Sequence, residues 1–182
     1  GVRRLVLCSS SVTVGFGSKA QPGNERTPIS DLDGVYGKSG PLRAYHDTKL
    51  ASERLVKTYV DKGLETVVVN PDYVIGAWDI KPTSGAMILQ MKRRSIPLHP
   101  VGGKCFVDAD DCAAAHLGAM DHGTPGERYL LGNDNYSYKE FMSLIAECVG
   151  RRPPRLPLPR AATWGLGQAG RVLTRVRPHS AA

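Results

Sequence analysis

The sequence lacks long apolar runs and is poor in aromatic residues. No stretch approaches the roughly 18 consecutive apolar residues that a membrane helix requires, so no membrane span is expected. Aromatic residues make up only 7% of the chain and are not interleaved with the basic ones, so nucleic acid is not an expected partner. The net charge of +7 indicates a solvated basic surface, which could also attract an anionic cofactor or substrate.

Cysteine patterns of the metal-binding and disulfide kinds are absent as well. Cys8, Cys105, Cys112 and Cys148 are widely spaced, and none forms a Cys-x-x-Cys pair. We expect no metal site and four reduced thiols, most of them buried as small apolar residues. Nothing marks a secretory signal, so a cytoplasmic location is the default expectation.

The 182 residues, 41% of them hydrophobic and 23% charged, are typical of one soluble domain. Residues 2–8 form a short apolar run with β-branched members, which predicts a strand buried on both faces of a parallel sheet. Residues 15–41 are rich in Gly, Pro, Ser, Asn and Asp, which predicts a long loop without helix or strand. Loops of this length in compact domains are usually functional or disordered.

A helix is predicted over residues 42–62, because Pro41 suits its first turn and Gly63 its end. Residues at spacings of three and four predict its buried face: Ala44, Thr48, Ala51, Leu55 and Tyr59. The following run ETVVVNP, residues 65–71, is a second buried strand. Two such strands joined by a helix make a crossover unit of a parallel sheet, so the fold class is α/β.

The remaining pattern continues the alternation. Residues 72–84 are predicted as a loop, residues 85–96 as a helix, and residues 104–123 as a strand followed by a helix with an acidic start. A short strand over residues 126–132 precedes a helix over residues 137–150, which opens with a Ser137–Glu140 capping box. The Pro-rich segment from residue 151 onward is expected to be extended.

Tyr45 and Lys49 lie four residues apart near the start of the first predicted helix. Side chains with this spacing project from one helix face, with Cβ atoms about 5–6 Å apart. A neighbouring ammonium group favours the phenolate, so the pair can donate and accept a proton near neutrality. Such a pair also arises by chance on helix surfaces, and alone it identifies no site.

A serine triplet, Ser9, Ser10 and Ser11, directly follows the first predicted strand. Ligand sites in open α/β sheets lie beyond the carboxyl ends of the strands, so a hydroxyl here is expected to hold a substrate oxygen. The order of apolar strand, serine triplet, long loop, Tyr-x-x-x-Lys helix and a strand ending in Asn-Pro is far more specific than any of its parts.

This order resembles the extended short-chain dehydrogenase/reductase family, which comprises NAD(P)-dependent nucleotide-sugar epimerases, dehydratases and related reductases. The resemblance lies in VLCSSSVTVG, YHDTKLASE, VVVNPDYVIG and FVDADDCAAAHLGAM. NPDYVIGAWDIKPTSG and GERYLLGNDNYSYKEF are most similar to the hopanoid-associated sugar epimerase and dihydroflavonol reductase-like branch. The resemblance implies a partial Rossmann-type fold, a doubly wound and mainly parallel sheet, with a small C-terminal substrate lobe.

The resemblance also implies roles for single residues. Tyr45 is expected to be the catalytic acid/base, Lys49 to bind the nicotinamide ribose and support Tyr45, and Ser11 to donate a hydrogen bond to the substrate. Pro71 and Val74 are expected to line the pocket of the cofactor, NAD or NADP. The expected substrate-binding residues are Ser10, Ser11, Asn70 and Lys81, with Ser10 replacing Ser11 if the register shifts by one.

Other residues near this motif have two readings. Lys81 is at least as well explained as an exposed loop lysine, and Trp78 either forms a pocket wall or simply packs. His46 points about 100° around the helix from Tyr45 and is expected at the polar surface. Three carboxylates are expected to cap a helix rather than bind a metal: Asp108, Asp110 and Asp111.

The sequence departs from the family pattern in two places. Thr48 stands where a serine is usual, and the glycine-rich dinucleotide motif is absent, because residues 14–17 follow the serine triplet and GVYGKSG has no preceding strand. About three βα units, roughly 100 residues, are therefore expected to be missing. We expect residues 1–150 to be the C-terminal part of the NAD(P)-binding domain with interleaved substrate-lobe segments, and residues 151–182 a truncated Pro/Arg-rich segment of that lobe.

The resemblance implies hydride transfer at a carbinol or carbonyl carbon of a nucleotide sugar or of a hydrophobic ketone or alcohol. By family analogy, the protein is expected to form a homodimer. Two other functions stay open at this point: an inactive truncated product, and a non-catalytic relative that senses a cofactor or binds a partner.

Overall fold

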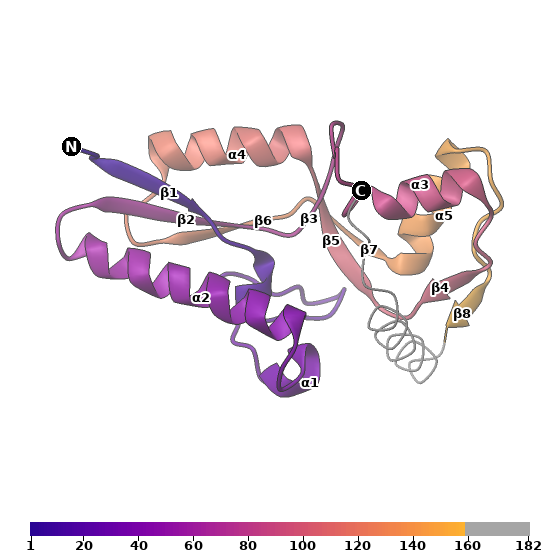
Figure 1. The fold of residues 1–182 in the computed structure, drawn as a ribbon, viewed down its shortest axis with the longest axis horizontal. Coiled ribbons are helices and arrows are strands. Elements are labelled where there is room, and N and C mark those ends of the chain that lie inside the picture. The colour runs from indigo at the N-terminus through magenta and orange to yellow at the C-terminus, as the bar shows by residue number, and fades with distance from the viewer. Residues whose placement is uncertain (159–182) are drawn as a thin grey trace, which may run out of the picture. The chain divides into compact units, whose positions relative to one another are not determined.

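A computed structural model of the chain describes residues 1–158, and the predicted extended tail lies outside these residues beyond Leu158. The chain divides into two compact units (Figure 1). Unit 1 comprises residues 1–84 and 105–135, and unit 2 comprises residues 85–104 and the chain from residue 136 onward. No helix within residues 1–158 has the length and hydropathy to cross a membrane.

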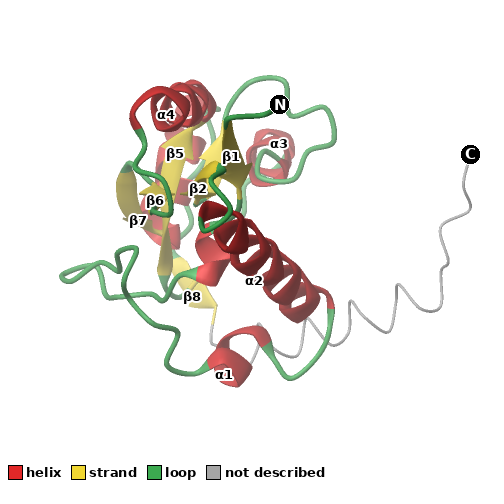
Figure 2. Ribbon diagram, turned by 90° about the vertical axis from the view of Figure 1, so that its left-hand side faces the viewer, coloured by secondary structure: helices red, strands yellow, loops and turns green. Residues whose placement is uncertain are grey.

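Unit 1 is built on a parallel sheet with the strand order β1-β2-β6, made of β1 (Arg4–Cys8), β2 (Glu65–Pro71) and β6 (Arg128–Leu131). The helices α2 (Pro41–Val60) and α4 (Ala109–His122) lie on opposite faces of this sheet (Figures 1 and 2). The predicted crossover is confirmed, since Val6 pairs with Val67 in parallel register.

The core of unit 1 lies on the central strand, β2. Val67 and Val69 are completely buried and pack with Ala119 of α4. Every residue of β2 after Glu65 is buried, because helices cover both faces of the sheet. This burial explains the continuous apolar run in the sequence.

Helix α2 presents a different face to the sheet from the one predicted. The expected stripe lies outward, with Leu55 60% and Tyr59 42% exposed. The two most buried side chains of α2 are instead polar, His46 and Glu53. The prediction was wrong because the inward face includes polar side chains with partners outside the helix. Tyr36 stacks on His46, and Glu53 accepts hydrogen bonds from the hydroxyls of residues 9 and 13.

The long loop contains more structure than its composition suggests. It includes a short helix, α1 (Leu32–Tyr36), and a 3-10 turn, η1 (Ser11–Thr13), lies just before the loop. Asp31 caps α1 by accepting a hydrogen bond from the Gly34 amide at 2.8 Å. A hydrogen bond between a side chain and the nearby backbone supports this helix. The prediction relied on apolar periodicity, which does not register such bonds.

Further short strands also escaped prediction. β3 (Tyr73–Ile75) lies where a loop was expected and pairs in parallel with β5 (Gly103–Asp108), in a sheet with the order β3-β5-β7. The other unforeseen strands are β4 (Leu98–Pro100) and β7 (Asp134–Ser137). Each is only three or four residues long, too short for an alternating pattern to be read.

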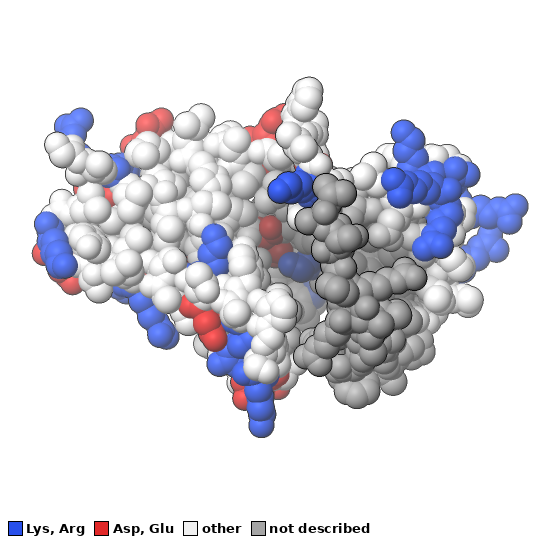
Figure 3. Space-filling view, in the orientation of Figure 1, with Lys and Arg blue, Asp and Glu red and all other residues white. Residues whose placement is uncertain are grey.

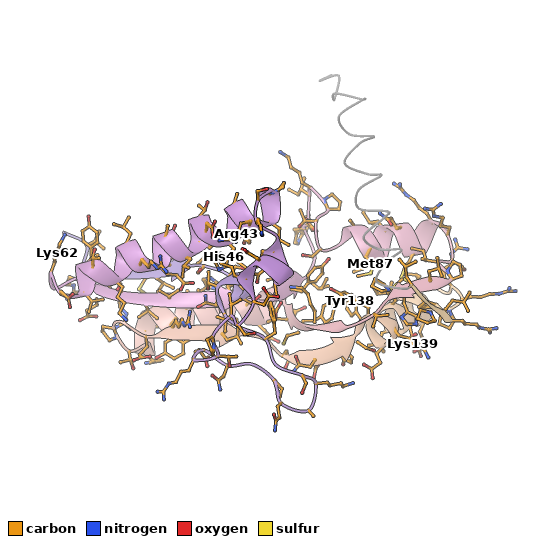
Figure 4. The ribbon with its side chains drawn as sticks, turned by 90° about the horizontal axis from the view of Figure 1, so that it is seen from below. Arg43, His46, Lys62, Met87, Tyr138 and Lys139 are labelled. Carbon is orange, nitrogen blue, oxygen red and sulfur yellow. The ribbon has the colours of Figure 1, made fainter. Side chains whose placement is uncertain are left out.

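In unit 2, α3 (Ala86–Arg93) and α5 (Tyr138–Cys148) pack around Met91, Met142 and Ile145, while β4 pairs with β8 (Leu156–Leu158). The predicted Ser137–Glu140 capping box is confirmed. Figure 4 labels Met87 on α3 and the first residues of α5, Tyr138 and Lys139. Basic side chains gather on the face of unit 2 seen in Figure 3.

All four cysteines are free thiols. Cys112 is buried and Cys105 partly so, and burial raises the pKa of both thiols. Cys8 and Cys148 are exposed, so the expectation that most cysteines are buried was wrong.

The long loop depends on a close approach of two backbone segments. Gly15 donates a hydrogen bond to the Thr27 carbonyl at 2.9 Å, and a Cβ at residue 15 would lie 2.1 Å from the Pro28 carbonyl oxygen. Gly15→Ala should therefore lower the free energy of unfolding by about 1–3 kcal/mol. Urea unfolding measures this change.

Gly118→Ala is the matched control, because a Cβ at this helical position meets nothing within 4 Å. It should stabilise the chain by about 0.5–1 kcal/mol. Equal effects of the two substitutions would contradict the close approach at Gly15.

Candidate active site

Helix α2 carries the predicted acid/base pair on one face. The Lys49 ammonium lies 5.8 Å from the centroid of the Tyr45 ring and donates a hydrogen bond to the Cys8 carbonyl at 3.0 Å. The Tyr45 side chain is exposed, and its hydroxyl has no hydrogen bond to any described residue. A phenol in this state is available to a ligand.

The serine triplet forms a turn at the carboxyl end of β1, and we call residues 9–13 the Ser turn. Its start is fixed by the Ser9 amide, which donates to the Val69 carbonyl at 2.8 Å. The Ser10 hydroxyl accepts from the Val12 amide at 3.4 Å and caps η1. The Ser11 hydroxyl is half-buried and has no hydrogen bond within residues 1–158.

Beneath the Ser turn lies a buried polar network that the sequence analysis did not foresee. Its centre is the Glu53 carboxylate, whose Oε1 accepts hydrogen bonds from the Ser9 hydroxyl and, at 2.7 Å, from the Thr13 hydroxyl. The Arg128 guanidinium of β6 lies 3.5 Å from the other carboxylate oxygen. The clue in the sequence was the spacing, because Glu53 is one more step of four after Tyr45 and Lys49.

Asn70 belongs to the same network and is completely buried. Its amide nitrogen donates to Glu53 at 2.7 Å, to the Thr13 hydroxyl at 3.0 Å and to the Ser10 carbonyl at 3.0 Å. Its carbonyl oxygen has no partner among the described residues. The structure therefore brings Asn70 to the inner side of the Ser turn.

A second set of contacts holds the Ser turn from the long loop. Tyr36 of α1 donates to the Val12 carbonyl at 2.8 Å, and its ring stacks on His46 with centroids 5.1 Å apart. Burial raises the pKa of Tyr36, and the charge of Asp72 adds to this effect. His46 is only 1% exposed, so its predicted surface location was wrong. The stacking ring and a neighbouring carboxylate explain its burial.

Charged residues join the start of α2 to α1. Arg43 pairs with Asp33 at 2.6 Å and with Asp47 at 3.0 Å, and the Nδ1 of His46 lies 2.8 Å from the Asp47 carboxylate. Figure 4 shows Arg43 and His46 in the first turns of α2. These bonds fix the end of the helix that carries Tyr45.

The other predicted site residues lie on different elements. Pro71 is buried as the last residue of β2, and Val74 is half-buried in β3, where it pairs with Val107. Lys81 is exposed and makes no hydrogen bond or ion pair with a described residue. Trp78 has a positive φ of 67° and is 92% exposed, so it does not simply pack against the protein.

A cavity of about 390 Å³ lies elsewhere in unit 1. Its lining includes Leu50, Glu53, Thr66, Val68 and Arg128, but not Ser11, Tyr45 or Lys49. It is adjacent to the first residues of β2 and β6, whereas the Ser turn follows the last residue of β1. Glu53 and Arg128 therefore belong to both the cavity and the network. No group of three or more potential metal ligands occurs within residues 1–158.

Comparison with known proteins identifies the family. The model of the NAD-dependent epimerase/dehydratase family matches residues 1–132. A Synechocystis protein named for dihydroflavonol 4-reductase is 33% identical over 87% of the chain and 46% of its own length. Sterol demethylase protein B of Methylococcus capsulatus is 32% identical over 91% of the chain and 48% of its own length.

A solved structure shares the fold. A nucleoside-diphosphate-sugar epimerase from Pseudomonas aeruginosa superimposes with a TM-score of 0.76 and 28% identity, over 93% of the chain and 54% of that protein. This similarity confirms the partial Rossmann-type α/β fold. The chain spans about half the length of the relatives that it matches.

The bonds at the start of α2 predict a pH effect. The hydrogen bond from His46, and then that from Arg43, hold the pKa of Asp47 below its usual value. The ionised carboxylate therefore stabilises the folded chain above the pKa of the unfolded state, and this stabilisation is lost as the pH falls through the folded-state pKa. Asp47→Asn should be less stable than wild type at pH 7, and the difference should shrink toward acidic pH.

Urea unfolding of both proteins at neutral pH and at about pH 3 measures the change. Because Asp47 is exposed, the prediction gives only the direction in which the stability difference changes with pH. A difference that persists or grows at low pH would contradict it.

Proposed function

Because the chain belongs to the NAD-dependent epimerase/dehydratase family, we propose that it supplies the proton-transfer residues of an NAD(P)-dependent epimerase or reductase. Tyr45 is the proposed acid/base, Lys49 its cationic partner and Ser11 the second hydroxyl at the substrate oxygen. The observation that carries the proposal is the bond between the Lys49 ammonium and the Cys8 carbonyl, which links the Tyr45 helix to the Ser turn.

Each residue has a defined part in the reaction. Tyr45 takes the proton from the substrate hydroxyl as the carbon is oxidised and returns it in the reverse direction. The positive charge of Lys49 stabilises the phenolate that forms, and the Ser11 hydroxyl donates a hydrogen bond to the substrate oxygen. Both hydroxyls are free of hydrogen bonds to described residues, which supports their availability to a substrate.

The residues present fit one end of a nicotinamide cofactor. The Lys49 ammonium has three N–H groups, and its one described hydrogen bond leaves donors for ribose hydroxyls. Pro71 and Val74, at the end of β2 and in β3, are the proposed lining of the nicotinamide pocket. The bound nicotinamide supplies the hydride chemistry. The chain has no glycine-rich loop for the pyrophosphate, so we expect only weak binding of a dinucleotide by this chain alone.

The proposed substrate is a nucleotide sugar or a hydrophobic ketone or alcohol, with Ser10, Ser11 and Lys81 as the proposed contacts. Asn70 is better suited to support the Ser turn, because its amide nitrogen is already bonded three times inside the protein. The exposed Trp78 and Ile80, next to Lys81, favour a substrate with an apolar part.

The test of the acid/base role is Tyr45→Phe, which removes the phenolic hydroxyl and keeps the ring. We would join the amino-terminal half of the Synechocystis relative to residues 1–182 and measure turnover with a ketone substrate and NADPH or NADH. Turnover should fall by about 10²- to 10⁴-fold while the Kd for the cofactor stays nearly unchanged.

Tyr59→Phe is the matched control, because Tyr59 is an exposed tyrosine of the same helix with a lysine over its ring, Lys62. It should leave turnover unchanged. Undiminished turnover of Tyr45→Phe would remove Tyr45 from its proposed role.

We also propose that two copies pair through the outward stripe of α2. This stripe includes Leu55 and Tyr59, whose large apolar side chains are exposed to water in the single chain. Leu55→Glu should shift the sedimentation coefficient of the chain toward that of a monomer, whereas Lys57→Glu should not. A wild-type chain that stays monomeric at high micromolar concentration would refute the pairing.

A further inference from the structure

We propose that Glu53 is a positioning residue, which holds the Ser turn against α2 and so sets where Ser11 stands relative to Tyr45 and Lys49. The inference rests on the proposed function for its catalytic meaning. Its structural part concerns only contacts within unit 1 and can be tested separately.

The first argument is the convergence of donors on one atom. Oε1 of Glu53 accepts from the hydroxyls of Ser9 and Thr13, which begin and end the Ser turn, and from the amide of Asn70. The side chain is 8% exposed, so these bonds form with little competition from water. The carboxylate therefore ties both ends of the turn to the helix and to the last residues of β2.

The second argument is the spacing along α2. Tyr45, Lys49 and Glu53 follow one another at four-residue intervals and so lie on successive turns of one helix face. Lys49 holds the main chain at Cys8, immediately before the Ser turn, and Glu53 holds the turn itself. The helix that carries Tyr45 is thus bonded directly to the Ser turn. The distance between the Tyr45 and Ser11 hydroxyls therefore depends on these bonds to α2.

The third argument concerns Ser11 itself. Its hydroxyl has no hydrogen bond within the described chain, so no side-chain bond of its own fixes its position. Only the surrounding contacts can do so: Glu53 and Asn70 on the inner side, and Tyr36 through the Val12 carbonyl on the other. Loss of Glu53 removes the side-chain contacts at both ends of the Ser turn at once.

The counter-charge for this buried carboxylate comes from Arg128, 3.5 Å from Oε2. Arg128 is also bonded to the Glu25 carbonyl of the long loop, and the Glu25 carboxylate accepts from the Leu130 amide at 2.9 Å. An ionised group enclosed in this way needs a paired charge and several hydrogen bonds to be tolerated. Both conditions are met at Glu53, and none of its hydrogen bonds within residues 1–158 involves Tyr45.

The structural test is amide hydrogen exchange of the 182-residue chain, read by NMR or by mass spectrometry. Glu53→Ala should raise exchange of the amides of residues 12–14 by at least about tenfold and leave that of α5 unchanged. Glu53→Gln keeps an acceptor oxygen for the three donors and should stay within about threefold of wild type. Glu127→Ala, which removes an exposed carboxylate from the same cavity, is the control.

If Glu53→Ala does not fold, Thr13→Val keeps the test decisive. Valine has the shape of threonine without its hydroxyl, so this variant deletes the bonds of that hydroxyl to Glu53, Asn70 and the Ser10 carbonyl and leaves the carboxylate in place. It should raise exchange in the Ser turn alone. Unchanged exchange there, or an equal rise throughout unit 1, would overturn a positioning role for Glu53.

The catalytic part is read in the chimera described above. Glu53→Ala should lower kcat by about 10- to 100-fold with the Kd of the cofactor nearly unchanged, and Glu53→Gln should recover most of the loss. An unchanged kcat would overturn the catalytic meaning of the positioning. If Tyr45→Phe keeps full turnover while the exchange results hold, the proposed function fails and the structural role of Glu53 stands.

Discussion

The hydrogen bonds between one helix and the end of one strand are the constraint on which the candidate site depends. From α2, Lys49 binds the main chain at Cys8 and Glu53 binds the two ends of the Ser turn. Because the helix is a rigid element, these bonds also determine where its own Tyr45 stands. The parallel crossover makes this possible, since it brings α2 back over the sheet beside the strand that it follows.

This arrangement places polar side chains in the interior of unit 1, where apolar side chains would need no hydrogen-bond partners. Asn70 and Thr66 are almost completely buried on the strand that also carries three consecutive valines, and the Asn70 side-chain carbonyl has no described partner. Buried polar groups need all their partners, so substitutions in this network should cost more than comparable ones in the valine core. We infer that the network contributes a defined geometry for the turn rather than extra stability.

Much of the fold could be predicted from the sequence, because its main signals are local. Apolar runs marked β1 and β2, Pro41 and Gly63 marked the ends of α2, and Ser137 marked the start of α5. The face of α2 could not be predicted in the same way. Apolar spacing pointed to the stripe containing Leu55, but His46 and Glu53 lie inward. Tyr36 and the Ser turn, which contact them, lie outside the helix, and the apolar pattern of the helix does not reveal them.

The same difference separates the parts of the site. Tyr45, Lys49 and the serine triplet could be found because their chemistry and spacing are visible in the chain, and the structure places Lys49 between the two. Glu53 and Tyr36 act through groups 24 to 44 residues away, so their positions carried no signal except one repeat of a four-residue spacing. Residues proposed to meet a substrate are thus easier to find in this sequence than residues proposed to hold them in place. A residue of the second kind is found only from the fold, which shows the donors that converge on one atom, as they do at the Glu53 carboxylate.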